Sequence, residues 1–264
     1  MARKTGSSYE AIDSPIDRLD PIVKFTGVFC LGLSAAIFPS FILGYLLLLF
    51  LFVVAYLAKV FKKFAKFIIG FAVPIMVMLF FIQGFFSPKN KTIIADFGFA
   101  QLGLEGIIHM LKIVSVLLVF LGSFYLTTKT TDTGRMVAAF KRIGLKGSTG
   151  YLVLATLNVI PQMQRRIAII QEAQNARGLE TTGSLLTRFK AFIPLIGPVI
   201  MSSLVDVQER GMTIEARGFS VKNVEQTSFI EAVETPLDRR IKRGLQVFLG
   251  LVIIITIMLK LKIF

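Results

Sequence analysis

Long runs of apolar residues are the feature that most constrains what this chain can fold into. Residues 22–58 are apolar almost throughout, with a break at Phe38-Pro39-Ser40. About 20 residues of helix cross the hydrocarbon core of a bilayer. The runs therefore predict five membrane-spanning helices, at 22–38, 41–58, 67–86, 106–126 and 245–259. The fold class that follows is an all-α polytopic membrane protein, in which the first predicted helix is short for a complete crossing.

The composition agrees with a membrane protein and excludes several kinds of site. Apolar residues make up 54% of the 264 residues and charged residues only 17%, against about a quarter charged in soluble domains. The single cysteine, Cys30, excludes a disulfide framework, and the single histidine, His109, excludes a multi-histidine metal cluster. The polar stretch 1–20 has no small-residue cleavage site, and it is not expected to be a cleavable signal.

Basic residues predict which loops face the cytoplasm. The net charge of +14 is compatible with nucleic-acid binding, but Lys and Arg in loops also orient membrane proteins. They gather near the N-terminus and in the loop after the second predicted helix: Arg3, Lys4, Arg18, Lys24, Lys59, Lys62, Lys63 and Lys66. We therefore expect a cytoplasmic N-terminus, an outside loop at 87–105 and no nucleic-acid partner. Five spans place the C-terminus outside, where Lys260 and Lys262 can snorkel to the interface.

The pattern of apolar residues divides the chain into three parts. Residues 1–127 contain the N-terminal entry and four spans, 128–243 form a basic cytoplasmic coupling domain, and 244–264 form the last span. Apolar residues in the middle part recur at helical spacing, which predicts helices at about 133–143, 150–177 and 184–217. Pro194 and Pro198 predict that the third of these is bent or interrupted. Asp132 and Asp238 flank this part and are expected to be solvated.

The two long predicted helices of the middle part end in the same three residues. One ends with Ala176-Arg177-Gly178 and the other with Ala216-Arg217-Gly218. Glycine adopts the left-handed conformation that ends a helix, and a cation suits the negative end of the helix dipole, so each end alone is an ordinary helix C-cap. Two copies in one segment favour a second interpretation. Alanine keeps each tip thin, and arginine presents a planar fork of donors to a carboxylate on a partner.

Three stretches of the sequence resemble the transmembrane coupling subunits of energy-coupling factor transporters, the EcfT/CbiQ family. The run 13–21, followed by Lys24, is similar to the N-terminal motif of that family, and the matching positions are Arg18, Leu19, Asp20, Pro21 and Lys24. The runs 159–178 and 193–219 are similar to its two Ala-Arg-Gly coupling regions. Asp17 replaces a common histidine, and Asn158-Val159 replaces Arg-Phe, which leaves the subfamily open.

The resemblance implies a non-catalytic subunit with two long crossing helices on the cytoplasmic face of the cell membrane. Each Ala-Arg-Gly end would dock into one of two ATP-binding-cassette ATPase subunits, through Ala176, Arg177, Gly178, Ala216, Arg217 and Gly218. A small substrate-binding membrane protein, the S component, would recognise a vitamin or a metal ion. The chain itself is expected to bind no cofactor or metal, because the partner subunits use the ATP. The transported compound and the identities of the partners are left open.

Other functions are weighed on the same residues. The chain has no Gly-x-x-x-x-Gly-Lys-Ser/Thr loop for ATP phosphates, and the superficially similar residues 144–149 are interpreted as a turn. A membrane-embedded enzyme would need clustered catalytic side chains at membrane depth, and the sequence offers no convincing cluster. A membrane scaffold whose basic domain binds anionic headgroups stays an alternative. A scaffold would tolerate lysine in place of Arg177 and Arg217, whereas bidentate pairing would not.

Overall fold

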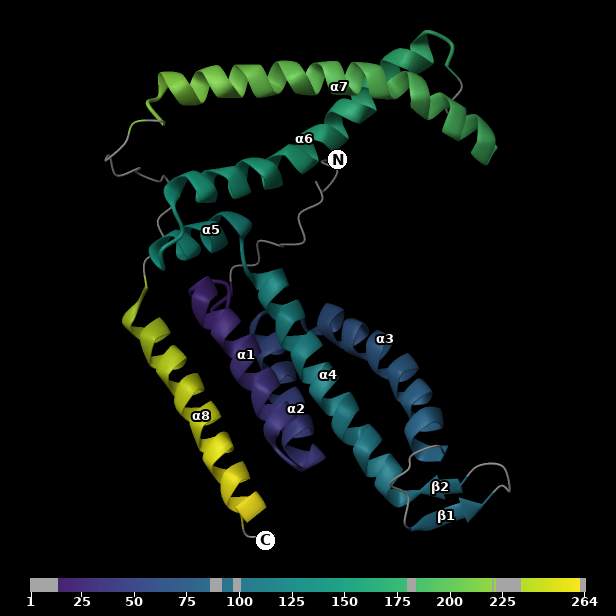
Figure 1. Cartoon of the computed structure of the whole chain (residues 1–264), viewed down its shortest axis with the longest axis vertical. Coiled ribbons are helices and arrows are strands. Elements are labelled where there is room, and N and C mark those ends of the chain that lie inside the picture. Colours follow the sequence, from purple (N-terminus) through teal and green to yellow (C-terminus); the bar gives the residue numbers. More distant parts are fainter. Residues whose placement is uncertain are drawn as a thin grey trace. The chain divides into compact units, whose positions relative to one another are not determined.

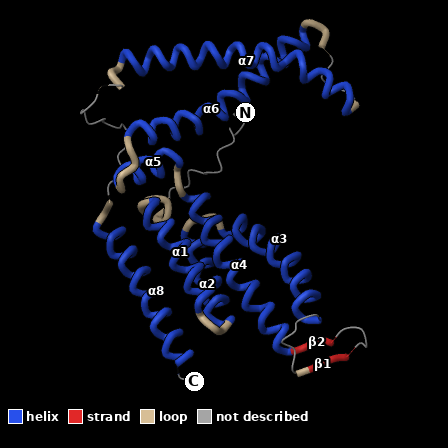
Figure 2. Tube along the Cα trace, in the orientation of Figure 1, coloured by secondary structure: helices blue, strands red, loops and turns tan. Residues whose placement is uncertain are grey.

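The computed structural model describes residues 14–85, 92–96, 101–179, 184–219, 221 and 234–261. Arg3, Lys4, Asp13 and Lys262, which the sequence argument used, lie outside these ranges. In chain order the elements are α1 (Pro21–Ile37), α2 (Phe41–Leu57), α3 (Phe61–Leu79), the π-helix η1 (Phe80–Phe85), β1 (Ile93–Asp96), β2 (Gln101–Gly103), α4 (Leu104–Thr130), α5 (Thr133–Arg142), α6 (Gly147–Ala176), α7 (Leu185–Ala216) and α8 (Pro236–Leu261) (Figure 1). Helix is the dominant structure (Figure 2), which confirms the predicted fold class.

The elements belong to two compact units. The larger, here called the bundle unit, contains α1 to α4, η1, the two strands and α8. The smaller, here called the crossing unit, contains α6 and α7. The division falls inside α5, between Ala139 and Phe140. The three-part division predicted from the sequence concerns which residues leave the bilayer, and it stays a prediction.

Helix α4 is the centre of the bundle unit. It packs against α1, α2 and α3, and α8 packs against α1. The side chains of Val114 and Val119 on α4 and of Phe64 on α3 are fully buried. Phe64 also meets the ring of Phe52 on α2 edge-on, with 5.0 Å between centroids, a favourable geometry for aromatic pairs. These apolar contacts hold α2 and α3 on the same side of α4.

Glycine allows α2 and α4 to approach closely. A Cβ atom at Gly44 of α2 would lie 2.3 Å from Oγ of Ser115 on α4, so no side chain fits there. On α4 itself, a Cβ atom at Gly122 would lie 3.3 Å from Phe64 and 3.4 Å from Leu51. Small residues at contacts of this kind let membrane helices pack closely. The two glycines therefore explain how α2 and α3 pack closely against α4.

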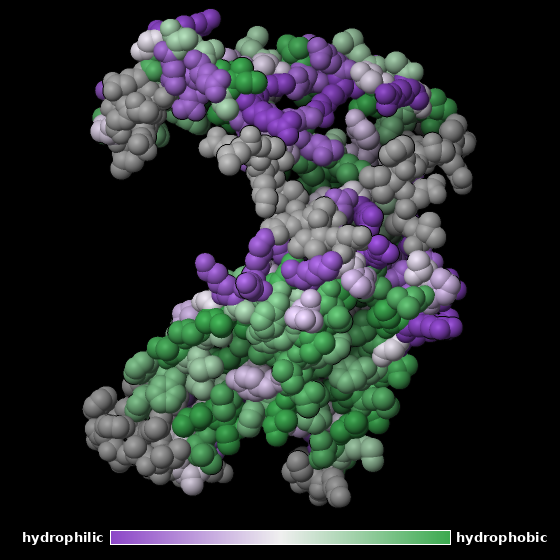
Figure 3. Space-filling view, turned by 180° about the vertical axis from the view of Figure 1, so that it is seen from behind, coloured by the Kyte–Doolittle hydropathy of each residue, from purple (hydrophilic) through white to green (hydrophobic). Residues whose placement is uncertain are grey.

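The outer surface of the bundle unit is apolar. Large side chains such as Leu49 on α2 and Val247 on α8 are more than half exposed, and Figure 3 shows hydrophobic residues covering the bundle helices. Three helical stretches of this unit, α3 with η1, α4 and α8, are long and apolar enough to cross a membrane. They correspond to the spans predicted at 67–86, 106–126 and 245–259. A multi-pass membrane protein is thereby confirmed.

Helices α1 and α2 lie where the first two spans were predicted, and both are short. Each has 17 residues, which at 1.5 Å per residue is about 26 Å, less than the ~30 Å of a hydrocarbon core. A side-chain oxygen caps the N-terminus of each helix. The Asp20 carboxylate accepts a hydrogen bond from the N–H of Ile22 at 3.5 Å, and the Ser40 hydroxyl accepts one from the N–H of Ile42 at 3.3 Å. The turn between the helices therefore lies at Phe38 to Ser40, as the sequence indicates.

Helix α7 is the fourth helix that length and composition would allow to cross a membrane, over Phe189–Ala216. The sequence argument placed this segment in the cytoplasmic domain, and that placement stays a prediction. The helix runs without a break through Pro194 and Pro198 and is bent along its length (Figure 1), so of the two predicted outcomes the bend occurs and the interruption does not. Helices α5 and α6 correspond to the helices predicted at 133–143 and 150–177.

The stretch 87–105 was predicted as a loop and contains a two-stranded antiparallel hairpin of β1 and β2. Consecutive β-branched residues at Ile93 and Ile94 favour a strand there. The Glu105 carboxylate at the start of α4 accepts hydrogen bonds from the Thr92 backbone N–H, at 3.2 and 3.3 Å to its two oxygens, and from the Thr92 hydroxyl. This side chain fastens the base of the hairpin to α4.

Candidate docking site on two helix ends

Helix α6 ends in a Schellman motif built around Gly178. Gly178 has a φ of +90°, a conformation that glycine adopts without strain. Its N–H donates to the carbonyl of Asn175 at 2.9 Å, and the N–H of Leu179 donates to the carbonyl of Gln174 at 3.0 Å. These two hydrogen bonds satisfy carbonyls that the end of a helix would otherwise leave without partners. Arg177 is the C-cap residue of this end.

Helix α7 ends in the same way, 40 residues further along the chain. Gly218 has a φ of +69°, and its N–H donates to the carbonyl of Glu215 at 2.9 Å. The N–H of Phe219 donates to the carbonyl of Ile214 at 3.2 Å. The Ala-Arg-Gly repeat in the sequence is therefore also a repeat of backbone conformation.

Both ends are presented to solvent within the described structure. Ala176, Arg177, Gly178, Ala216, Arg217 and Gly218 are all exposed. Among the described residues, neither arginine side chain makes a hydrogen bond or ion pair. The small alanine beside each arginine leaves the guanidinium group accessible. Each end can therefore offer two parallel N–H donors to a planar acceptor such as a carboxylate.

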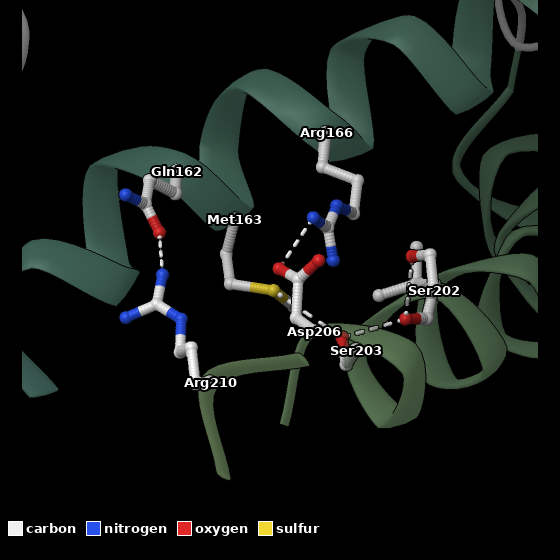
Figure 4. A network of polar contacts seen from close by, with 8 residues as sticks. Gln162, Met163, Arg166, Ser202, Ser203, Asp206 and Arg210 are labelled. Atoms are coloured by element: carbon white, nitrogen blue, oxygen red, sulfur yellow. Dashed lines mark hydrogen bonds and ion pairs between the residues drawn. The ribbon is translucent and has the colours of Figure 1, made fainter. Parts of the chain in front are cut away.

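An ion pair joins α6 to α7 where the two helices cross (Figure 4). Nη2 of Arg166 lies 2.5 Å from Oδ2 of Asp206, and the two side chains are 25% and 33% exposed. Beside this pair the hydroxyl of Ser203 donates to the sulfur of Met163 at 3.5 Å. Both contacts join residues that are 40 positions apart. The two Ala-Arg-Gly ends are also 40 positions apart, so the residues that meet at the crossing occupy equivalent positions in α6 and α7.

A third polar contact at the crossing joins Arg210 of α7 to the side-chain carbonyl of Gln162 on α6 (Figure 4). The crossing lies at the same distance from both arginine tips. Arg177 follows Arg166 by eleven positions, and Arg217 follows Asp206 by eleven positions. At 1.5 Å per residue each arm is about 16 Å long. The sequence argument predicted the crossing helices from family resemblance, but it missed these contacts. The sequence does show a positive charge at Arg166 and a negative charge at Asp206, each eleven positions before a tip arginine.

The N-terminal motif lies in the bundle unit, where it joins the starts of α1 and α8. The backbone N–H of Asp20 donates to Oδ1 of Asp238 at 3.1 Å. Oδ2 of Asp238 accepts from the backbone N–H of Thr235 at 3.0 Å and from its hydroxyl at 2.6 Å. The Asp238 residue is only 1% exposed, so the expectation that it is solvated was wrong. Burial is tolerated because its carboxylate accepts three hydrogen bonds.

The other motif residues complete this junction. Nζ of Lys24 donates to the carbonyl of Thr130 at the end of α4, at 2.5 Å, and to the carbonyl of Asp17 at 3.4 Å. Pro21 is buried at the first position of α1, where its missing N–H costs nothing. Leu19 is half-buried and Arg18 is exposed. The motif therefore connects α1, α4 and α8, a role that the sequence alone did not indicate.

The junction gives a stability prediction. Asp238→Asn is expected to destabilise the bundle unit by about 1–3 kcal/mol, because the amide NH₂ replaces an acceptor that faces backbone donors. The check is the midpoint of thermal unfolding of the purified chain in detergent. Glu234→Gln is the matched control, since within the described ranges the Glu234 side chain makes a 3.6 Å ion pair with the exposed Arg239, and such pairs contribute about 0–1 kcal/mol. Equal shifts for the two variants would contradict the assigned role of Asp238.

The fold and these sites define a class of protein: a polytopic α-helical membrane protein that carries two crossing helices with arginine tips. The family described as cobalt transport protein, CbiQ, matches residues 13–228. The chain is 30% identical, over 79% of its length and 81% of the relative's, to the energy-coupling factor transporter transmembrane protein EcfT of Bacillus selenitireducens. The EcfT proteins of Listeria innocua and Bacillus subtilis are 28% and 29% identical, each over 78% of this chain and 81% of their own length. The chain belongs to the EcfT/CbiQ family of energy-coupling factor transporter transmembrane proteins, as its motifs predicted.

Proposed function

We propose that this chain is the coupling subunit of an energy-coupling factor transporter and that its two arginine tips dock onto two ATPase subunits. The observation that carries the proposal is the pair of identical, exposed helix ends at Arg177 and Arg217, held at equal distances from one crossing. A repeated tip suits a pair of similar sockets better than a single partner surface. Each socket would supply a carboxylate for bidentate pairing with one guanidinium group.

In this function the chain transmits force and performs no chemistry. ATP would be bound and hydrolysed by the two partner subunits, and this chain would hold no cofactor or metal. Closure of the ATPases on ATP would move the two tips relative to one another. Because α6 and α7 are joined at Arg166 and Asp206, a movement at one tip is passed to the crossing as a rotation of a stiff helix. The equal arms would let both ATPases act on the crossing alike.

A second partner would be the small substrate-binding S component, which recognises the vitamin or metal ion to be taken up. Helix α7 exposes a series of large apolar side chains that no other described element covers: Leu186, Phe189, Phe192, Ile193, Ile196, Ile200, Met201, Leu204 and Val205. Exposed apolar patches of this kind mark contacts with other proteins or with lipid. An apolar membrane protein is a partner of matching chemistry for this face of α7.

The proposed location is the cell membrane, with the N-terminus and the crossing unit in the cytoplasm. The polar contacts at the crossing support the cytoplasmic placement of α7. Arg166, Asp206, Gln162 and Arg210 meet side by side in the C-terminal halves of the two helices (Figure 4). Two arginines and an aspartate at that depth would be costly inside a bilayer. A helix that shares this polar contact with α6 is better placed at the aqueous face.

Conservative replacement of the tips distinguishes docking from the alternative of a lipid-binding scaffold. Arg177→Lys with Arg217→Lys keeps both charges and removes the bidentate fork. Each tip then loses one charge-assisted hydrogen bond, worth about 1.5–3 kcal/mol, so the recovery of ATPase subunits with the tagged chain is expected to fall at least about tenfold. Mass spectrometry of the recovered complex measures it.

The scaffold alternative gives the opposite result in the same variant. Binding of the basic domain to anionic headgroups depends on charge, so it predicts unchanged partner recovery and unchanged binding to vesicles containing phosphatidylglycerol. Full ATPase recovery with both lysines in place would therefore count against bidentate docking. Loss of ATPase recovery with unchanged vesicle binding would support it.

A further inference from the structure

An open pocket of about 670 Å³ lies in the bundle unit at the turn between α2 and α3. Three lysines, Lys59, Lys62 and Lys63, and two aromatic residues, Tyr56 and Phe61, line it. The two rings meet edge-on with centroids 6.4 Å apart; Tyr56 is largely exposed and Phe61 is somewhat less than half exposed. Nothing in the proposed coupling mechanism uses this pocket.

No acidic residue stands close to the pocket residues in the sequence. Residues 21–95 contain no aspartate or glutamate, so the whole of α1, α2 and α3 carries positive charge alone. Lys66, about one turn beyond Lys62 on α3, adds to it but does not line the pocket. A cavity lined by three ammonium groups is complementary to an anion. Lysines in a cytoplasmic loop also set the orientation of a membrane protein. That effect depends on the number of lysines in the loop and not on their exact positions.

Lys59 has a backbone conformation that its role in orienting the protein in the membrane does not explain. Its φ of 58° is the one positive value among the described residues other than glycine. Its N–H donates to the carbonyl of Tyr56 at 3.0 Å, and the N–H of Val60 donates to the carbonyl of Ala55 at 3.1 Å. This is the same helix cap that Gly178 and Gly218 form, with lysine in the place that favours glycine. The strained cap holds the Lys59 side chain at the pocket rim.

We propose that this pocket binds the phosphate group of an anionic phospholipid. Lys59, Lys62 and Lys63 would pair with the phosphate, and Tyr56 and Phe61 would lie at headgroup level, where aromatic side chains of membrane proteins gather. The acyl chains would continue along the lipid-facing side of the two helices, where Val53 of α2 and Ile69 of α3 are more than half exposed. The exposed apolar side chains on the two helices that flank the lysines favour a lipid over free phosphate. The proposal does not depend on the coupling function.

The test uses the full-length chain in detergent, titrated with phosphatidylglycerol and followed by native mass spectrometry. Lys59→Gly removes the charge and relaxes the backbone at once. It is expected to weaken phosphatidylglycerol binding about fivefold, the contribution of one lysine near an anionic headgroup, while the midpoint of thermal unfolding stays equal or rises. Lys62→Gln is expected to weaken binding to a similar degree. The matched control is Lys66→Gln, which makes the same charge change outside the pocket and is expected to alter binding less than about twofold.

Three results would overturn the assignment. Unchanged phosphatidylglycerol affinity in Lys59→Gly would show that the strained lysine does not contact the lipid. An equal loss in Lys66→Gln would show attraction by general charge and not by a pocket. Displacement of the lipid by inorganic phosphate at equal concentration would assign the pocket to free phosphate. Weak binding of phosphatidylcholine to the unaltered chain, together with the expected variant order, would support the lipid site.

Discussion

Reversal of charge at both tips, Arg177→Glu with Arg217→Glu, is expected to abolish stable association of the chain with its ATPase subunits. Each tip would then present a carboxylate to an acidic socket. Removal of one partner from a desolvated charge pair costs about 2–5 kcal/mol, so two reversed tips lose at least about 4 kcal/mol, roughly a thousandfold in Kd. The measurement is recovery of ATPase subunits with the tagged chain from solubilised membranes.

The control for this experiment carries the same change in charge on the same two helices. Arg165 on α6 and Lys190 on α7 are exposed and lie away from the tips. The double variant Arg165→Glu with Lys190→Glu should therefore recover the ATPases nearly as well as the unaltered chain. Both variants are expected to insert into the membrane at normal levels, because no bundle residue changes. Undiminished ATPase recovery with the reversed tips would rule out the docking role of Arg177 and Arg217.

Single substitutions at the tips should have intermediate effects. With Arg177→Glu alone, the tip at Arg217 can still bind its own ATPase subunit. Since one rigid unit carries both tips, binding at one raises the effective concentration of the other at its socket. The loss for the double variant is therefore expected to exceed the product of the two single losses.

The helix ends could be predicted because their determinants are local. A glycine directly after a run at helical spacing is enough to place a Schellman motif, and Gly178 and Gly218 both form one. The apolar runs are local in the same sense, since about 20 consecutive residues decide a span. Family resemblance added the crossing of α6 and α7 and the prediction that the partners of the arginines are ATPase subunits, which no local pattern contains.

The features that sequence reasoning missed depend on contacts between distant residues. Asp238 is buried because the N–H of Asp20, 218 positions away, donates to it, and a flanking aspartate in a basic stretch gives no sign of this. The hairpin at 93–103 was missed because its strands of four and three residues are too short to show an alternating pattern. The π-helix η1 continues α3 with the same apolar composition. The sequence therefore located the apolar helical stretch, but it did not predict the change from α-helix to π-helix.

Arg166→Asp is expected to loosen the crossing of α6 and α7 while leaving both tips intact. It replaces the 2.5 Å ion pair with two negative charges that face each other across the crossing, and such juxtaposed like charges disfavour the crossed arrangement. About 1.4 kcal/mol already reduces the population of the crossed state tenfold relative to open ones. Spin labels at Glu172 and Met212, exposed positions close to the tips, would measure the effect by double electron–electron resonance. Replacing the buried, single Cys30 by serine makes the labelling specific.

The distance distribution between the labels should be narrow in the unaltered chain and broad in Arg166→Asp. Exchange of the two charges, Arg166→Asp with Asp206→Arg, restores an ion pair and should restore the narrow distribution, which a merely disruptive substitution would not allow. Arg165→Asp changes the neighbouring exposed residue by the same charge and should leave the distribution unaltered. A narrow distribution in Arg166→Asp would mean that the other contacts of the crossing, such as the hydrogen bond from Ser203 to Met163, fix it without the ion pair. If the ion pair does fix it, the proposed movement of one ATPase would reach the other through this ion pair, and Arg166→Asp would break the coupling while preserving the docking.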